Sequence, residues 1–102
     1  DGPVIETERP RVAIIVDDGG NNRAVDEGFL ELDPGLTLAI LPFTPYDAHI
    51  AKEGAARGFE IMLHMPMESD SPTVTHEGMI LTTMEAAAIV EWTAAALEEI
   101  PG

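Results

Sequence analysis

Residues 11–20 read R-V-A-I-I-V-D-D-G-G, and this stretch decides the fold of the chain. The apolar run from Val12 to Val16 lacks polar alternation, which is typical of a strand buried on both faces of a parallel sheet. Asp17 and Asp18 follow where this strand is expected to stop, and two glycines then allow a sharp turn. Open α/β sheets and α/β barrels carry their chemistry at the carboxyl ends of strands, so this position is a candidate site.

Asp17 and Asp18, called the acidic doublet below, have two interpretations. Two neighbouring carboxylates repel each other, and a bound cation would relieve that repulsion. The alternative is that one aspartate caps the following helix while the other is simply solvated. Both interpretations stay open at this point.

Composition limits the classes of partner. The chain has 5 basic and 19 acidic residues among 102, which gives a net charge of −14. Such a surface repels phosphate backbones and anionic lipid, so nucleic acid and membrane surfaces are not expected partners. There is no cysteine, which excludes disulfides, thiolate metal sites and cysteine nucleophiles. No apolar run approaches the ~18 residues of a membrane span, and the oligomeric state is left open.

Strand and helix patterns alternate along the chain. Each strand pattern is followed by a helix pattern, the last after a loop, and this order requires parallel strands with right-handed crossovers. The strand patterns start near residues 12, 36 and 59, and the helix patterns cover about 22–32, 47–57 and 82–100. The sequence therefore predicts the α/β class.

Domain limits follow from the same patterns. Residues 1–10 are polar with two prolines and are expected to be a linker, and residues 11–102 to form the domain. A final helix without a following strand suggests that the domain is incomplete, with its C-terminal strands missing.

Local signals predict three further details. Asn21 or Asn22 can cap the first helix, and Thr82 with Glu85 fits a capping box for the last helix. Trp92, in the middle of that helix, is expected to be a core anchor rather than a sugar platform.

The predicted strands end on the acidic doublet, on residues 42–45 and on His64, and parallel strand ends meet at one edge of a sheet. A lone histidine is more often structural, but carboxylate and imidazole together are ligands for Zn²⁺ or a similar divalent ion. In this interpretation Asp18 and His64 bind the metal and Asp17 is free to act as the base.

The third metal ligand is not obvious from the residue pattern. Glu68 is one candidate, although Pro66 disfavours a helical face shared with His64. His76 is expected in an exposed loop and His49 on a helix, so neither is favoured. The missing ligand can also lie beyond Gly102.

Three runs of sequence carry a family resemblance: I-I-V-D-D-G-G-N-N, L-T-L-A-I-L-P-F-T-P and G-F-E-I-M-L-H-M-P-M-E. In this order they resemble the divergent polysaccharide deacetylase family, a branch related to the NodB-type carbohydrate esterases, over about residues 11–102. The resemblance implies the N-terminal part of a distorted (β/α) barrel with fewer than eight regular units. It also implies bacterial export and a periplasmic or otherwise extracytoplasmic role near envelope polysaccharide.

The resemblance also implies roles for individual residues. Asp17 takes the position of the catalytic base, Asp18 that of a metal ligand, and His64 that of the first histidine of the second motif. Typical relatives place a second histidine and a proline where this chain has Glu68 and Ser69. The branch usually carries P-M-E-P there, and its downstream Asn-Asn-His motif would follow Gly102.

These observations predict a metal-dependent hydrolase, with zinc as the expected metal, that removes N- or O-acetyl groups from a polysaccharide or peptidoglycan-type substrate. The alternative is an inactive deacetylase-like module that binds envelope glycan or a protein partner. A phosphoacceptor receiver domain ranks last, because it needs an aspartate at the end of its third strand, where this chain has His64.

Overall fold

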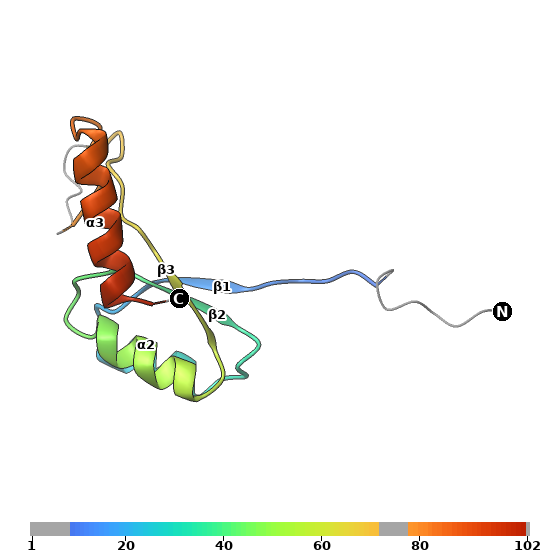
Figure 1. The fold of residues 1–102 in the computed structure, drawn as a ribbon. Helices are drawn as coiled ribbons and strands as arrows, with labels where there is room; N and C mark the ends of the chain where they lie inside the picture. Colours follow the sequence, from blue (N-terminus) through green and yellow to red (C-terminus); the bar gives the residue numbers. More distant parts are fainter. Residues whose placement is uncertain (1–8, 72–77, 102) are drawn as a thin grey trace.

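The computed structural model describes residues 9–71 and 78–101. Residues 1–8, within the predicted linker, and His76 lie outside the described residues. The elements in chain order are β1 (Ile15–Gly19), α1 (Arg23–Leu30), β2 (Thr37–Ile40), α2 (Asp47–Ala56), β3 (Glu60–Leu63) and α3 (Ala86–Glu99). This alternation of strands and helices confirms the predicted α/β class (Figure 1).

The three strands form one parallel sheet in the order β1-β2-β3. Thr37 of β2 pairs with Ile15 on one side and with Glu60 on the other, so β2 is the central strand. The carboxyl ends of the three strands therefore lie at one edge, as the sequence predicted. Closure of such a sheet into a barrel stays a prediction.

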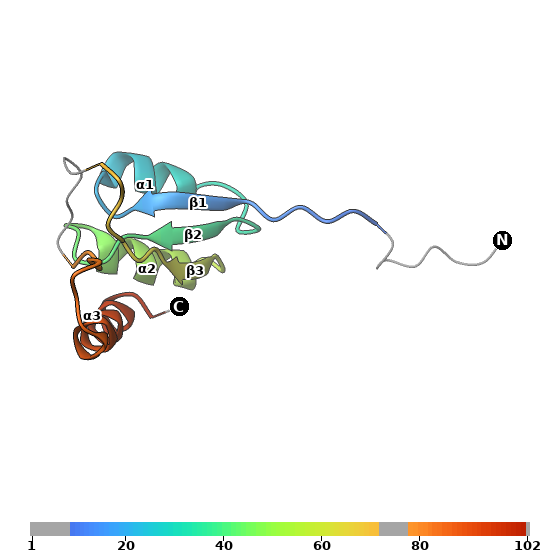
Figure 2. The ribbon, with the colours of Figure 1, turned by 90° about the horizontal axis from the view of Figure 1, so that it is seen from above.

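α1 and α2 cover one face of the sheet (Figure 2). Side chains from β2, β3 and both helices form the core there, because alternate residues of each strand point toward the helices. Gly54 of α2 lets the helix approach β3 closely, since a Cβ at this position would lie 2.8 Å from Ile61 Cδ1. The buried core residues are Leu30, Leu38, Ile40, Ile50, Ala51, Phe59, Ile61 and Ile100.

β1 is not buried on both faces, so that expectation is wrong. The strand begins at Ile15 rather than Val12, and the acidic doublet lies inside it instead of after it. Val12 is 86% exposed and Ile15 is 52% exposed. The physical reason is that β1 is an edge strand and the helices of the described ranges cover only one face of the sheet. Residues 9–14, directly before β1, run away from the body as an extended arm (Figure 1).

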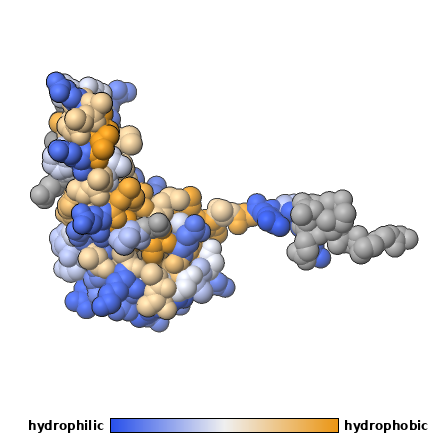
Figure 3. Space-filling view, viewed as in Figure 1, coloured by the Kyte–Doolittle hydropathy of each residue, from blue (hydrophilic) through white to orange (hydrophobic). Residues whose placement is uncertain are grey.

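α3 stands away from the sheet and is attached near its C-terminal end (Figure 1). Ala96 and Ile100 are fully buried, and Ile100 belongs to the core. Trp92 is 38% exposed and is absent from the core, so its prediction as a core anchor is wrong. Apolar surface extends along α3 (Figure 3). No helix among the described residues is long and apolar enough to cross a membrane.

The predicted capping box at the start of α3 is also wrong. Glu85 is the N-cap residue and its side chain makes no capping hydrogen bond. Thr82 Oγ1 instead donates a hydrogen bond to Glu68 Oε2 at 2.8 Å. The hydroxyl of Thr82 therefore bonds to a residue fourteen positions upstream rather than to the backbone of its own helix. By contrast, Asn22 caps α1 as predicted, because its Oδ1 accepts a hydrogen bond from Val25 N–H at 3.1 Å.

Candidate metal and catalytic site

The acidic doublet lies in a β-bulge. Val16 pairs with Leu38 and Gly19 pairs with Ile40, so two residues of β1 lie between these pairs but only one residue of β2 does. In a regular strand, neighbouring side chains point to opposite faces. A bulge adds an unpaired residue and re-aims its side chain, which is why bulges recur beside active sites. The irregularity thus gives two adjacent carboxylates a way to face one point.

Asp18 supplies the backbone turn of this bulge. Its φ is 62°, in the left-handed region that costs an L-residue about 1–2 kcal/mol. With this conformation, Asp18 Oδ1 lies 3.0 Å from His64 Nδ1 and Asp17 Oδ1 lies 3.8 Å from the same nitrogen. The three residues that the sequence singled out are therefore brought together.

His64 is held by the end of the sheet. Its backbone N–H donates to Ile40 O at 2.9 Å and so continues the pairing of β3 with β2. Its Nδ1 is shielded from solvent but has no hydrogen-bond partner, because the 3.0 Å approach to Asp18 is poorly directed for one. A buried polar atom without a partner is costly and calls for an explanation. Both carboxylates are well exposed, which leaves the site open to solvent.

This donor pair fits a divalent metal. Two ligand atoms on one tetrahedral zinc ion lie about 3.4 Å apart, given bonds of about 2.0–2.2 Å to nitrogen and oxygen. Asp18 Oδ1 and His64 Nδ1 are 3.0 Å apart, a few tenths of an ångström closer than that spacing, and an ion would give the orphaned nitrogen a partner. Within the described ranges, however, no group of three or more His, Cys, Asp or Glu side chains could hold a metal.

Glu68, the candidate third ligand, is engaged elsewhere. Its carboxylate accepts hydrogen bonds from Thr82 Oγ1 and, at 3.4 Å, from Thr82 N–H. Its backbone N–H donates to Ile80 O, and Ile80 N–H donates to Pro66 O. Glu68 therefore ties together two segments that are distant in sequence. His49 lies on the exposed surface of α2, with its Nε2 3.3 Å from Glu27 Oε1.

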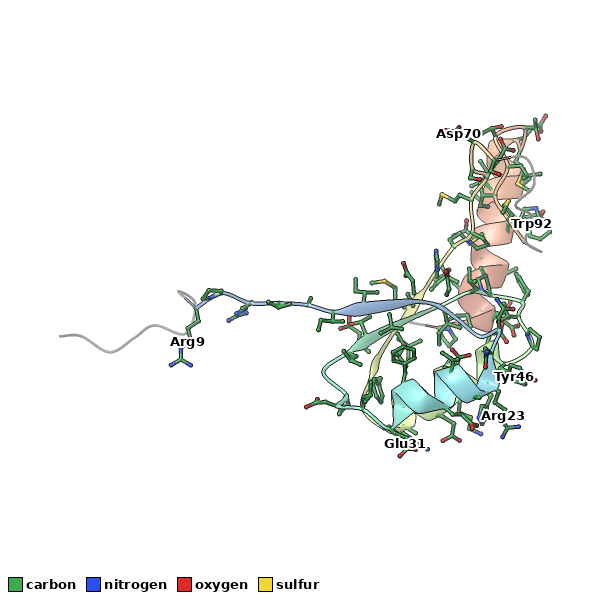
Figure 4. All side chains as sticks on the ribbon, turned by 180° about the vertical axis from the view of Figure 1, so that it is seen from behind. Arg9, Arg23, Glu31, Tyr46, Asp70 and Trp92 are labelled. Carbon is green, nitrogen blue, oxygen red and sulfur yellow. The ribbon has the colours of Figure 1, made fainter. Side chains whose placement is uncertain are left out.

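The turn that carries the doublet is fastened to the next turn. Gly19 O accepts a hydrogen bond from Leu41 N–H, and Gly20 O accepts one from Tyr46 N–H, both at 2.9 Å. Gly20 has a φ of 113°, and a Cβ there would overlap Thr44 Oγ1, so only glycine fits. Figure 4 labels Tyr46 and Arg23 at this end of the body, while Glu31 marks the other end of α1.

Sequence reasoning missed two buried aspartates that support these turns. Asp26 Oδ2 accepts a hydrogen bond from Gly20 N–H at 2.9 Å, and Asp47 Oδ2 accepts one from Phe43 N–H at 2.7 Å. Each aspartate lies in the first turn of the helix that follows its strand. An acidic residue at this helical position was the available signal, because carboxylates there favour the helix N-terminus.

Neighbouring side chains shift the pKa values of Arg23, Glu27 and Glu99. A hydrogen bond with Glu27 raises the pKa of Arg23, and hydrogen bonds from Arg23 and then His49 lower the pKa of Glu27. The three side chains are 42–60% exposed on α1 and α2, so they form an ion-pair network in contact with solvent. A hydrogen bond with Asp47 raises the pKa of Glu99 at the end of α3.

A parallel sheet with two carboxylates and a histidine at its carboxyl edge defines an α/β protein with a candidate site at the ends of its strands. Residues 14–102 match the model of the divergent polysaccharide deacetylase family. The match covers most of the chain, and the chain belongs to this family. The resemblance inferred from the three motifs is thereby confirmed.

Two individual proteins are similar to the chain. An uncharacterized protein of Haemophilus influenzae is 29% identical over 79 residues, which cover 78% of this chain and 28% of that protein. The crystal structure of an uncharacterized protein from Agrobacterium tumefaciens C58 aligns with a TM-score of 0.81 at 20% identity. That alignment covers 93% of this chain and 40% of the other, and it supports the fold alone. The chain thus spans less than half the length of either relative.

Proposed function

We propose that this chain forms part of a metal-dependent deacetylase that hydrolyses N- or O-acetyl groups on a carbohydrate polymer of the cell envelope, outside the cytoplasm. The observation that carries the proposal is the meeting of Asp17, Asp18 and His64 at the carboxyl edge of the sheet. Membership of the divergent polysaccharide deacetylase family supports a carbohydrate substrate.

Each of the three residues has a role in this proposal. Asp18 and His64 would hold the ion, with zinc as the expected metal, and a third ligand would come from outside the described residues. When bound, such an ion supplies Lewis acidity to the acyl carbonyl and to the attacking water. Asp17 accepts the proton of that water on its carboxylate, and its exposure leaves it accessible to substrate. The products are acetate and the free amine or hydroxyl of the sugar.

The test uses the full-length protein that contains residues 1–102, assayed for zinc content and for release of acetate from acetylated glycan. Wild type is expected to bind zinc stoichiometrically and to release acetate. Asp17→Asn should lower turnover by about 10²–10⁴-fold with little effect on zinc content, because the base is lost while both ligands remain. His64→Ala should lower both turnover and zinc affinity.

His49→Ala is the matched control, since this exposed histidine is paired with Glu27 and is expected to leave zinc content and turnover unchanged. Retained activity in both Asp17→Asn and His64→Ala would refute the assignment. A folded, metal-free protein that binds glycan would instead identify the chain as part of a binding module.

A further inference from the structure

Asp26 is a buried carboxylate that the proposed chemistry does not use. The residue is 7% exposed and lies in the first turn of α1, and its Oδ2 accepts a hydrogen bond from Gly20 N–H at 2.9 Å. Burial of an ionisable group costs free energy unless its partners compensate. A neutral side chain would avoid this cost, so the carboxylate needs a reason to be here.

The bond to Gly20 lies immediately after the acidic doublet. Asp18 has its left-handed φ of 62° two residues earlier, and Gly20 continues with a φ of 113°. The carbonyl groups of Gly19 and Gly20 are held from the side of β2 and α2 by Leu41 N–H and Tyr46 N–H. Asp26, on α1, holds the turn by accepting a hydrogen bond from Gly20 N–H. The end of the bulge is therefore fixed at three backbone points, of which one depends on a side chain.

We propose that Asp26 is the positioning residue of the acidic doublet. By fixing Gly20 N–H, it maintains the bulge and the left-handed backbone of Asp18, and so keeps both carboxylates facing His64. The inference rests on the proposed function, because only a shared ion or substrate makes this alignment matter. A regular strand would send Asp17 and Asp18 to opposite faces of the sheet. A charged acceptor suits the task, because hydrogen bonds to ionised groups are about twice as strong as neutral ones.

Asp47 provides a matched control for a merely structural role. It is 4% exposed, lies in the first turn of α2 and accepts a hydrogen bond from the backbone of a strand-end turn, at Phe43. Its turn carries no carboxylate of the doublet. Replacement of either aspartate should lower the stability of the fold, but only replacement of Asp26 should disturb the doublet.

The experiment measures the affinity of the full-length protein for zinc alone by isothermal titration calorimetry. Loss of a residue that orients a metal ligand typically lowers metal affinity about 10–100-fold. Asp26→Ala is expected to lower zinc affinity at least tenfold, and Asp26→Asn, whose neutral amide oxygen is a weaker acceptor, about threefold. Asp47→Ala and Asp47→Asn are expected to leave zinc affinity unchanged. Equal losses for the two positions, or no loss at Asp26, would overturn the proposal.

If Asp26→Ala does not fold, the two asparagine variants decide the question in the same way. A second readout does not need metal: a left-handed Asp18 gives a strong intraresidue Hα–HN contact in the NMR spectrum. Asp26→Asn should weaken this contact and shift the Gly20 amide proton upfield, whereas Asp47→Asn should change neither. A wild-type protein that binds no zinc would refute the metal site. The NMR readout would then support the positioning role if the contact weakens, and reject it if the contact persists.

Discussion

The bulge and turn at the end of β1 (residues 17–20, the β1 turn) and the turn after β2 (residues 42–45, the β2 turn) are built alike but carry different side chains. Both contain a residue with a left-handed backbone, Asp18 with φ 62° and Phe43 with φ 60°. In both, a buried aspartate in the first turn of the next helix accepts a hydrogen bond from the backbone of the turn. The first turn presents two exposed carboxylates, whereas the second presents an aromatic ring.

The difference shows how one backbone device serves two purposes. In the β1 turn, the left-handed residue is Asp18, whose carboxylate lies beside His64. The backbone strain therefore positions a side chain of the candidate site. In the β2 turn, the ring of Phe43 packs against Gly78, where a Cβ would lie 2.8 Å from Phe43 Cδ2. There, the same strain supports packing. Equivalent substitutions in the two turns should therefore change the stability of the protein differently.

Gly20→Ala is expected to give the largest effect, because the two turns meet at this residue. An added Cβ would overlap Thr44 Oγ1, and the φ of 113° is unfavourable for any L-residue. Strain and overpacking together should lower the free energy of unfolding by about 2–4 kcal/mol. Urea denaturation measures the loss.

Gly28→Ala is the control for this substitution, because Gly28 lies in α1 and a Cβ there meets nothing within 4 Å. Alanine in a helix interior should stabilise the protein by about 0.5–1 kcal/mol. Equal effects at the two glycines would show that the close contact between the turns is absent.

The second prediction compares glycine at the two left-handed positions. Asp18→Gly should stabilise the protein by about 1 kcal/mol, because it relieves strain and removes only a solvent-exposed side chain. Phe43→Gly should destabilise it by about 1–2 kcal/mol, because the lost packing of a half-buried ring exceeds the same relief. Thermal unfolding of both variants shows whether each substitution raises or lowers the stability.

Asp18→Asn controls for the loss of charge, since asparagine tolerates the left-handed region, and it should leave stability near wild type. A destabilising Asp18→Gly would mean that the carboxylate, rather than the backbone strain, dominates the energy of this turn.

The sequence predicted those features of the fold that depend on interactions between residues close together in the chain. The alternation of strand and helix patterns placed the acidic doublet and His64 at the same edge, and Asn22 was recognised as a cap because its partner lies three residues away. The bulge was not predictable in this way. It is a shift in backbone pairing between β1 and β2, and the apolar run before Asp17 reads the same with or without it.

Burial and long-range partners account for the remaining errors. Val12 and Ile15 belong to an apolar run that is typical of a buried strand. Their exposure, however, depends on which elements pack against β1. Thr82 and Glu85 fit the sequence pattern of a capping box. The Thr82 hydroxyl instead donates a hydrogen bond to Glu68, which lies in a distant segment of the chain. In the same way, Asp26 and Asp47 have partners in turns that the sequence does not define. The residues of the candidate site could be predicted from their types and their positions at strand ends. The aspartates that support the turns could not, because their hydrogen bonds depend on the folded backbone.

The smallest predicted effect concerns the link between the β2 turn and α3. Asp47 also contacts Glu99, and the hydrogen bond with Asp47 raises the pKa of the Glu99 carboxyl. A carboxyl whose pKa is raised on folding contributes stability below its unfolded pKa, and this contribution is lost as the pH rises through the folded pKa. The attachment of α3 should therefore weaken modestly from acid toward neutral pH, over a range that begins near the normal glutamate pKa.

Hydrogen exchange of Ile100 N–H, which donates to Ala96 O at the attached end of α3, reports this equilibrium once intrinsic exchange is corrected. Glu99→Gln should remove the pH dependence, because an amide can donate to the Asp47 carboxylate without binding a proton. Glu98→Gln, at the exposed neighbouring position, should retain it. The same series should leave the β1 turn untouched, since Asp26 has no such partner on α3 among the described contacts. A pH-dependent response at Gly20 N–H that disappears in Glu99→Gln would show that the two turns act as one unit.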